Sequence, residues 1–255
     1  ALQEQSGIHV LCALKGFSMW EVFPLMMNYL SGGTASSLNE ARLIHDEMGK
    51  KAHSCFVAYS QEEFNEVQEL SSHITFNSMS QFERFKKELK KDIQYALRIN
   101  PEFSNVDFMQ YNPCASGSRF GVTFDELPAI FPDEITGVHF HTLCESSAEN
   151  FKDVLEVIES KFEHILHHVK WVNFGGGHHI TQKDYDINLL SSLLNTVRDK
   201  YDLEVYIEPG EAIALNAGFL LAKVEDVVTN QNEKTAVLNV SFAAQNKKVL
   251  ENTME

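Results

Sequence analysis

Short apolar runs alternate with amphipathic segments from the beginning of the chain to about residue 217. Each run ends at polar residues or glycine, which is typical of strands buried in a parallel sheet. Eight such units predict an α/β fold, a parallel (β/α)8 barrel, and an open doubly wound sheet is the alternative. The expected strands are residues 9–14, 31–36, 54–58, 73–77, 94–99, 136–141, 170–174 and 203–208.

Amphipathic helices separate several of the expected strands. Residues 79–90 and residues 150–169 each place apolar side chains at the spacing of one helix face. Asp184 is expected to cap the helix that continues to Lys200, because an aspartate before a helix accepts hydrogen bonds from its first N–H groups. Helices are the usual connection between parallel strands, so this alternation favours the barrel.

The pattern changes after residue 217. Residues 219–228 and 235–242 are β-rich, and the polar segment between them contains no helix, which predicts a hairpin. We therefore expect a barrel domain over residues 1–217 and the beginning of an antiparallel β domain over residues 218–255. A single hairpin does not form a stable domain, and the chain does not begin with Met, so we expect the sequence to be truncated or gapped.

The composition is that of a globular protein with an acidic surface. A length of 255 residues suits one barrel, and 44% hydrophobic with 22% charged residues argues against disorder. The formal net charge of −15 disfavours nucleic acid and anionic membranes as partners, and it is compatible with a cationic small-molecule substrate.

The cysteines and the absence of long apolar stretches indicate a cytoplasmic protein. The four cysteines are scattered without a Cys-x-x-Cys pair, which favours reduced thiols over a disulfide framework. We find no apolar stretch long enough for a membrane span and no signal sequence. We therefore expect no membrane partner.

Several polar groups stand where the expected strands end. Lys15 follows the first strand, Arg98 and His141 end the fifth and sixth, and Glu208 ends the eighth. The carboxyl ends of barrel strands meet at one face, where active sites lie. A single polar residue at a strand end is usually solvated or involved in packing, but a complementary set favours a functional site.

A glycine run follows the seventh strand. The backbone N–H groups of Gly175, Gly176 and Gly177 can close on an anion, although a bare run of glycines is also compatible with a flexible turn. No Lys-Ser or Lys-Thr follows, which disfavours a nucleotide P-loop. A primary amine (Lys15), a turn that binds phosphate and a carboxylate (Glu208) are together what a pyridoxal phosphate site requires.

Histidines also allow a metal interpretation. His139 and His141 alternate on one strand, and His178 and His179 follow the glycines, so they could supply imidazole ligands. An accompanying carboxylate ligand is not obvious from the sequence, and the ligand spacing matches no known pattern. We therefore expect no metal.

Specific motifs occur in a fixed order over residues 8–244. They are Ala13-Leu-Lys-Gly-Phe-Ser18, Thr34-Ala-Ser-Ser-Leu38, Phe76-Asn-Ser78, Leu97-Arg-Ile-Asn-Pro-Glu102, Tyr111-Asn-Pro-Cys-Ala-Ser-Gly-Ser-Arg-Phe-Gly121, Gly137-Val-His-Phe-His-Thr-Leu-Cys-Glu145, Phe174-Gly-Gly-Gly-His-His-Ile-Thr181 and Ile207-Glu-Pro-Gly-Glu-Ala212. In this order the chain resembles the fold-type III, alanine racemase-like pyridoxal-phosphate decarboxylases, which include ornithine and diaminopimelate decarboxylases.

The resemblance implies a role for each strand-end group. Lys15 would bind the aldehyde carbon of pyridoxal 5′-phosphate covalently, and His141 would stack on the cofactor ring. Glu208 would pair with the pyridine nitrogen, Gly175–Gly177 would bind the phosphate, and Arg98 would lie beneath the cofactor. The family also implies a homodimer with shared active sites. Its second-domain cysteine and aspartate motifs are absent, and residues 245–255 do not match the family.

Two departures from the ornithine decarboxylase pattern resemble the carboxynorspermidine and carboxyspermidine decarboxylase branch. The usual Glu-Pro-Gly-Arg ends here in Glu211, and the usual Gly-Ser after the stacking histidine is Leu143-Cys144. A carboxylate at residue 211 suits a long polyammonium substrate through charge-assisted hydrogen bonds.

This branch implies a lyase of polyamine biosynthesis. It would release CO₂ from carboxynorspermidine or carboxyspermidine to give norspermidine or spermidine, with Glu211 binding the cationic substrate. Decarboxylation of diaminopimelate or a basic amino acid is one alternative. A non-catalytic relative that binds pyridoxal phosphate is the other.

Overall fold

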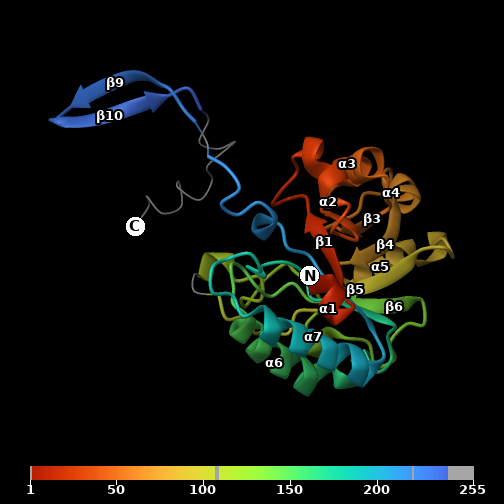
Figure 1. The fold of residues 1–255 in the computed structure, drawn as a ribbon. Coiled ribbons are helices and arrows are strands. Elements are labelled where there is room, and N and C mark those ends of the chain that lie inside the picture. Colours follow the sequence, from red (N-terminus) through yellow and green to blue (C-terminus); the bar gives the residue numbers. More distant parts are fainter. Residues whose placement is uncertain (1, 107–108, 220, 241–255) are drawn as a thin grey trace. The chain divides into compact units, whose positions relative to one another are not determined.

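The computed structural model describes residues 2–106, 109–219 and 221–240, and its main feature is a closed parallel barrel (Figure 1). Each strand pairs with the next in chain order, and β8 pairs with β1. The predicted (β/α)8 barrel is therefore confirmed, and the open sheet is excluded. The strands are β1 (His9–Ala13), β2 (Gly32–Ala35), β3 (Ala52–Cys55), β4 (Ser71–Phe76), β5 (Gln94–Arg98), β6 (Ile135–His139), β7 (Trp171–Asn173) and β8 (Glu204–Ile207).

The helices lie outside the barrel, and all but α1, which precedes β1, stand between successive strands. They are α1 (Leu2–Ser6), α2 (Phe23–Met26), α3 (Leu38–Met48), α4 (Phe64–Leu70), α5 (Met79–Phe85), α6 (Ala148–Leu166) and α7 (Ile187–Tyr201), with the short 3-10 helices η1 (Trp20–Val22), η2 (Lys86–Glu88), η3 (Met109–Tyr111), η4 (Phe124–Glu126) and η5 (Glu211–Ile213). The two amphipathic patterns are confirmed as α5 with η2 and as α6. None of the helices in the described ranges is long and apolar enough to cross a bilayer.

Helix α7 begins later than the sequence indicated. Asp186 is its N-cap, and its carboxylate accepts the N–H of Leu189 at 2.8 Å. The prediction that Asp184 caps this helix is wrong, because Asp184 has a φ of 65° and lies in the preceding loop. Both aspartates stand near the helix start, and only the backbone path decides which one reaches the first turn.

Most apolar side chains pack between the strands and the helices, and the barrel interior is more polar. Two large clusters line the outer faces of the strands. Inside the barrel, the apolar cluster contains Leu11, Ala96, Trp171 and Tyr206. Because successive strand residues point to opposite faces, β6 buries Val138 in the outer core and leaves His139 for the interior. Polar groups can therefore gather inside at the carboxyl ends.

The remaining unit is a hairpin. Contacts divide the chain into Ala1–Leu215 and Asn216–Glu255. The second unit contains β9 (Val224–Asn230) and β10 (Glu233–Leu238), which pair antiparallel, so the predicted hairpin is confirmed with shorter strands. Its two turn residues have positive φ angles of 49° and 68°, which is typical of a tight hairpin turn. The last two residues of the expected second strand lie outside the described residues.

Candidate active site

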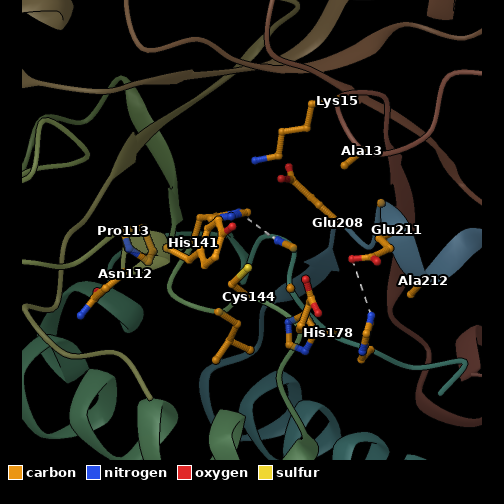
Figure 2. A pocket seen from close by; sticks show the side chains of 18 of the residues that line it. Ala13, Lys15, Asn112, Pro113, His141, Cys144, His178, Glu208, Glu211 and Ala212 are labelled. Carbon is orange, nitrogen blue, oxygen red and sulfur yellow. Dashed lines mark hydrogen bonds and ion pairs between the residues drawn. The ribbon is translucent and has the colours of Figure 1, made fainter. Parts of the chain in front are cut away.

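A cavity of about 350 Å³ opens at the carboxyl ends of the barrel strands (Figure 2). The structure brings nearly all of the predicted site residues into its wall. The predicted residues that line it are Lys15, Arg98, His141, Gly176, Gly177, Glu208 and Glu211. Gly175 is buried behind the wall and is not among the lining residues.

Lys15 lies in the turn after β1, opposite the turn after β8. These two turns touch because glycines stand at the contact: a Cβ on Gly16 would lie 2.9 Å from the Cα of Gly210. The close approach brings the Lys15 side chain over the carboxylate of Glu208, and Figure 2 shows the two charged ends pointing toward each other. The amine and the acid therefore share one end of the cavity.

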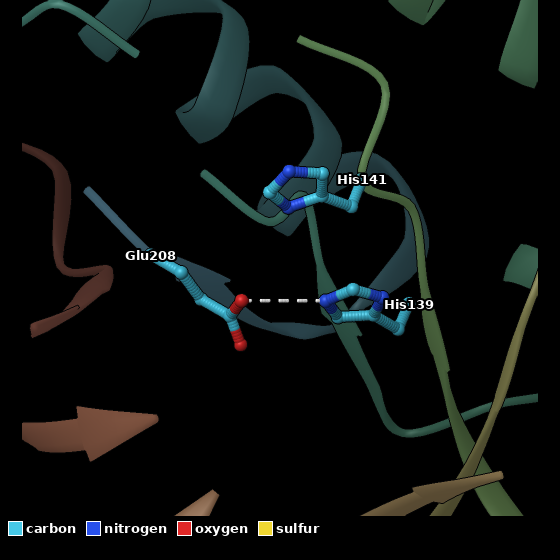
Figure 3. A group of neighbouring side chains, drawn as sticks. All are labelled: His139, His141 and Glu208. Atoms are coloured by element: carbon cyan, nitrogen blue, oxygen red, sulfur yellow. Dashed lines mark hydrogen bonds and ion pairs between the residues drawn. The ribbon is translucent and has the colours of Figure 1, made fainter. Parts of the chain in front are cut away.

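The Glu208 carboxylate is buried, with 5% of the residue exposed, and protein donors hold both of its oxygens. Asn173 donates to Oε1 at 2.7 Å, and Nε2 of His139 lies 3.4 Å from Oε2 (Figure 3). Burial raises the pKa of Glu208. The charge and hydrogen bond of His139 and the charge of Lys15 together lower it by more than burial raises it, so the net shift of the pKa is downward. Glu208 is consequently ionised at neutral pH.

His141 is a neutral ring at the cavity wall. The N–H of Gly176 donates to its Nδ1 at 3.0 Å, which leaves the ring proton on Nε2. Burial lowers the pKa of His141 well below 6.5, and the charges of Lys15 and Arg98 lower it further. The rings of His139 and His141 are nearly parallel, with 13° between their planes and 6.3 Å between centroids. A flat uncharged imidazole of this kind can pack against an aromatic ligand.

The glycine turn shapes the wall next to His141. Gly175 and Gly177 have φ angles of 68° and 89°, which side chains rarely adopt, and a Cβ on Gly177 would collide with the carbonyl of Leu143. The N–H of Gly175 donates to Asn173 at 2.8 Å. Two of the three N–H groups thus hold Asn173 and His141, a role that the sequence did not indicate. Binding of phosphate by this turn stays a prediction.

Arg98 ends β5 and is largely buried, with 8% exposed. Its guanidinium carbon lies 4.4 Å from the ring centroid of Phe120, a cation–π contact that orients the charge. Phe120 belongs to the segment Tyr111–Gly121, which was part of the sequence resemblance without an assigned role. Four residues of that segment line the cavity: Tyr111, Asn112, Pro113 and Phe120. Gln110, just before the segment, belongs to the same wall.

Two exposed acidic residues, Glu145 and Glu211, also line the cavity. Glu211 begins η5, and its Oε2 lies 3.7 Å from Nε2 of His179. One ligand atom each from Glu145, His179 and Glu211 lies within 4.8 Å of the others. The sequence indicated Glu211 but not Glu145, because only the folded chain brings the loop after β6 beside the loop after β8.

The structure also supplies the carboxylate that the metal interpretation lacked. Ligand atoms of His139, His141 and Glu208 lie within 4.8 Å of one another (Figure 3). These atoms already hydrogen-bond within the protein, and the positive charges of Lys15 and Arg98 act on His141. Adjacent cations disfavour a bound metal ion.

The residues of this cavity suit pyridoxal 5′-phosphate. Its volume lies within the range of about 300–1,000 Å³ that is usual for small-molecule sites. The wall offers an amine for the aldehyde, a flat ring for stacking and an ionised carboxylate for a ring nitrogen, from Lys15, His141 and Glu208 respectively.

Comparisons with known proteins point to the same cofactor. Residues 1–215 match the family described as "Pyridoxal-dependent decarboxylase, pyridoxal binding domain". The chain is 42% identical over 241 residues to a carboxynorspermidine/carboxyspermidine decarboxylase of Campylobacter jejuni, which covers 94% of this chain. It is 41% identical over 245 residues to a carboxyaminopropylagmatine decarboxylase of Synechocystis, which covers 95% of this chain. The chain spans 63% of the length of each relative.

Solved structures show the same fold. The crystal structure of carboxynorspermidine decarboxylase complexed with norspermidine from Campylobacter jejuni matches with a TM-score of 0.85 and 39% identity, over 94% of this chain and 62% of that one. A diaminopimelate decarboxylase structure matches with a TM-score of 0.78 at 19% identity, over the same shares of the two chains.

Proposed function

The chain belongs to the pyridoxal-dependent decarboxylases, and from this premise we propose that it releases CO₂ from carboxynorspermidine or carboxyspermidine in polyamine biosynthesis. Its cofactor is pyridoxal 5′-phosphate. The observation that supports the proposal most is the shared cavity of Lys15, His141 and Glu208. These three groups come from the turn after β1, the residues after β6 and the residue after β8. Decarboxylation of an amino acid with pyridoxal phosphate needs an amine, a stacking ring and a carboxylate in one site.

Lys15, Glu208 and His141 each have a defined task in this proposal. When bound, the cofactor supplies an electron-withdrawing ring that accepts the electron pair left behind as CO₂ departs. Nζ of Lys15 would hold the aldehyde carbon of the cofactor. The Glu208 carboxylate holds a proton at the ring nitrogen, because an anion facing that nitrogen favours its protonated form. The neutral ring of His141 would pack against the cofactor ring and exclude water from that side.

Glu211 is proposed to bind the substrate. It stands at the outer end of the cavity with Glu145, and a long substrate that enters there presents its secondary and distal ammonium groups to these carboxylates. Hydrogen bonds between ammonium and carboxylate are charge-assisted and stronger than neutral ones. Arg98 and the glycine turn are proposed to contact the cofactor.

Replacing Lys15 tests the assignment of the amine. In Lys15→Ala, reduction of the protein with borohydride in the presence of pyridoxal phosphate should leave no cofactor attached to the chain, and CO₂ release should be lost. Peptide mass spectrometry of the native chain should find the cofactor on Lys15. Lys183→Ala, a change at an exposed loop lysine, is the control and should behave as the native chain does. Unchanged labelling and turnover in Lys15→Ala would refute the assignment.

Substrate choice is tested by direct comparison. CO₂ release is measured with carboxynorspermidine, carboxyspermidine, carboxyaminopropylagmatine and diaminopimelate. We include carboxyaminopropylagmatine because the Synechocystis relative is 41% identical. We expect the highest kcat/KM with the carboxylated polyamines. A preference for diaminopimelate would contradict the proposal, and cofactor binding without any turnover would favour a non-catalytic relative.

We also propose that the protein is a cytoplasmic homodimer and that residues 218–255 belong to an antiparallel β domain. The acidic composition and the scattered cysteines support the location. The hairpin of β9 and β10 supports the second domain. Light scattering of the purified protein measures its mass in solution, and a monomer at micromolar concentration would contradict the dimer.

A further inference from the structure

A line of polar side chains crosses the barrel interior beneath the cavity. Sγ of Cys55, at the end of β3, lies 4.0 Å from Nδ1 of His139 on β6. The other ring nitrogen of His139 lies 3.4 Å from Oε2 of Glu208. Asn173, at the end of β7, donates to Oε1 of Glu208 at 2.7 Å. His139 is therefore placed between a thiol and a carboxylate, with one nitrogen directed to each.

The position of Cys55 follows from the strand period. His53 lies two residues earlier on β3 and stacks inside the barrel on His73, with 3.8 Å between ring centroids. Cys55 points to the same side as His53, because alternate strand residues share a face. Only part of the residue is exposed, because protein surrounds its thiol, and it has no disulfide partner. Cys55 is not one of the residues that line the cavity.

The charges around His139 favour a proton on its ring. Burial lowers the pKa of His139, but Cys55 and Glu208 raise it, with a net value of about 9. Burial raises the pKa of the Cys55 thiol, but His139 and then Arg98 lower it, and the net shift is downward. The pKa of His139 is raised and the pKa of Cys55 is lowered, as expected when a proton passes from the sulfur to the nitrogen.

Other titratable groups also face His139. His53 on β3 and His141 after β6 interact electrostatically with His139 itself, whereas Arg98 on β5 acts on Cys55 and Lys15 after β1 acts on Glu208. The nearby cations oppose a proton on His139, whereas Glu208 and an ionised Cys55 favour it. Cys55 and Glu208 lie 4.0 Å and 3.4 Å from its two nitrogens and outweigh the cations, because together they raise the pKa of His139 despite its burial.

We propose that Cys55 and His139 form a thiolate–imidazolium pair that positions Glu208 to face the ring nitrogen of the cofactor. The S–H bond of Cys55 breaks, and its proton forms the N–H bond at Nδ1 of His139. The ring then donates from Nδ1 to the Cys55 sulfur and from Nε2 to Glu208. With Asn173 on the other oxygen, Glu208 is oriented from both sides. His139 and Cys55 are positioning residues, and their effect on the reaction rests on the function proposed above.

The pair is tested first without the cofactor. The ultraviolet absorbance of thiolate is titrated with pH in the native chain and in Cys55→Ser, and the difference reports Cys55 alone. Its midpoint should lie below the ordinary thiol value of 9.0. In His139→Gln the midpoint should rise above 9.0, because burial remains and the imidazolium is gone. A native midpoint at or above 9.0, or one that His139→Gln leaves unchanged, would overturn the pair.

His73→Gln is the matched control for the first test. It removes a partly buried histidine of the barrel interior that does not contact Cys55, so the Cys55 midpoint should not move. Cys12→Ser is the control for the subtraction, since burial raises the pKa of Cys12 to about 12 and its removal should leave the low-pH absorbance unchanged.

The second test measures the positioning of Glu208. Nitrogen-15 resonance of labelled pyridoxal phosphate reports the proton on its ring nitrogen in the bound state. In His139→Gln the pH at which this proton is lost should fall by at least about one unit, because Glu208 loses a donor and its orientation. Cys55→Ser should shift it in the same direction by less. An unchanged midpoint in both variants would refute the positioning role.

The two tests separate this inference from the proposed function. If the native chain does not bind pyridoxal phosphate, the proposed function fails while the Cys55 titration still decides whether the pair exists. If the cofactor binds on Lys15 but Cys55 titrates as an ordinary thiol, only the present inference fails.

Discussion

Three histidines near the cavity, which would have the same pKa in an unfolded chain, have different pKa values in the folded protein. The pKa of His139 rises to about 9 despite its burial, because Cys55 and Glu208 face it. Burial lowers the pKa of His178 to about 4, and burial together with neighbouring cations lowers that of His141 well below 6.5. A sequence shows only that these residues are histidines. Their protonation depends on which charges the barrel brings within a few ångströms.

The proposed role of Glu211 in substrate binding is tested by reversing its charge. In Glu211→Arg, KM for the polyamine substrate should rise by about tenfold to a hundredfold, because a charge-assisted hydrogen bond is replaced by repulsion. The Kd for pyridoxal phosphate, measured by equilibrium titration, should change much less. Glu47→Arg, an exposed change on α3, is the control. Equal KM values in native chain and Glu211→Arg would count against a role in substrate binding.

At the scale of elements, apolar periodicity located the strands because each buries an outer face against helices. The largest displacement is in β3, predicted at residues 54–58 and found at Ala52–Cys55. His53 explains it: a histidine weakens an apolar pattern, yet this one is buried by stacking on His73 inside the barrel. Helix α7 shows the same limit at its start, where two aspartates compete as the cap.

The cap of α7 gives a stability prediction. Asp186→Ala should lower the free energy of unfolding by about 1 kcal/mol, because it leaves the N–H of Leu189 without its acceptor. Urea unfolding followed by circular dichroism measures the difference. Asp184→Asn is the control, since asparagine tolerates the left-handed conformation at that position and Asp184 is not the cap. A larger loss for Asp184→Asn would contradict the assignment.

At the scale of the whole molecule, the barrel interior has two ends of different chemistry. The end toward the amino termini of the strands contains packed aromatic rings: His53 stacks on His73, and Tyr206 packs against His53 at a tilt. The opposite end contains the charged groups of the cavity. Burial lowers the pKa of His73 to about 4 and that of His53 well below 6.5, so both stay neutral in the folded protein.

These neutral histidines should make the fold sensitive to acid. The pKa of His73 is lower in the folded state than its ordinary 6.5, so the unfolded chain binds the proton first and stability is lost as pH falls from 6.5 toward 4. His73 alone should account for about 3 kcal/mol at pH 4. Urea unfolding at neutral pH and near pH 4 measures the loss of unfolding free energy on acidification. This loss should be about 3 kcal/mol smaller in His73→Asn than in the native chain. The same loss in both proteins would contradict this origin.

The sequence by itself determined the barrel, the order of its strands and the residues at their carboxyl ends, because apolar periodicity and strand direction are local properties of the chain. Lys15 and Glu208, nearly two hundred positions apart, could be assigned to one face for that reason alone. Only the tertiary structure decided that Asn173 and His139 hold Glu208, that Gly176 fixes the proton of His141, and that Glu145 joins Glu211. These contacts depend on side chains from different strands meeting in a space with little water, where a shift of a few ångströms changes the charge that a group can hold.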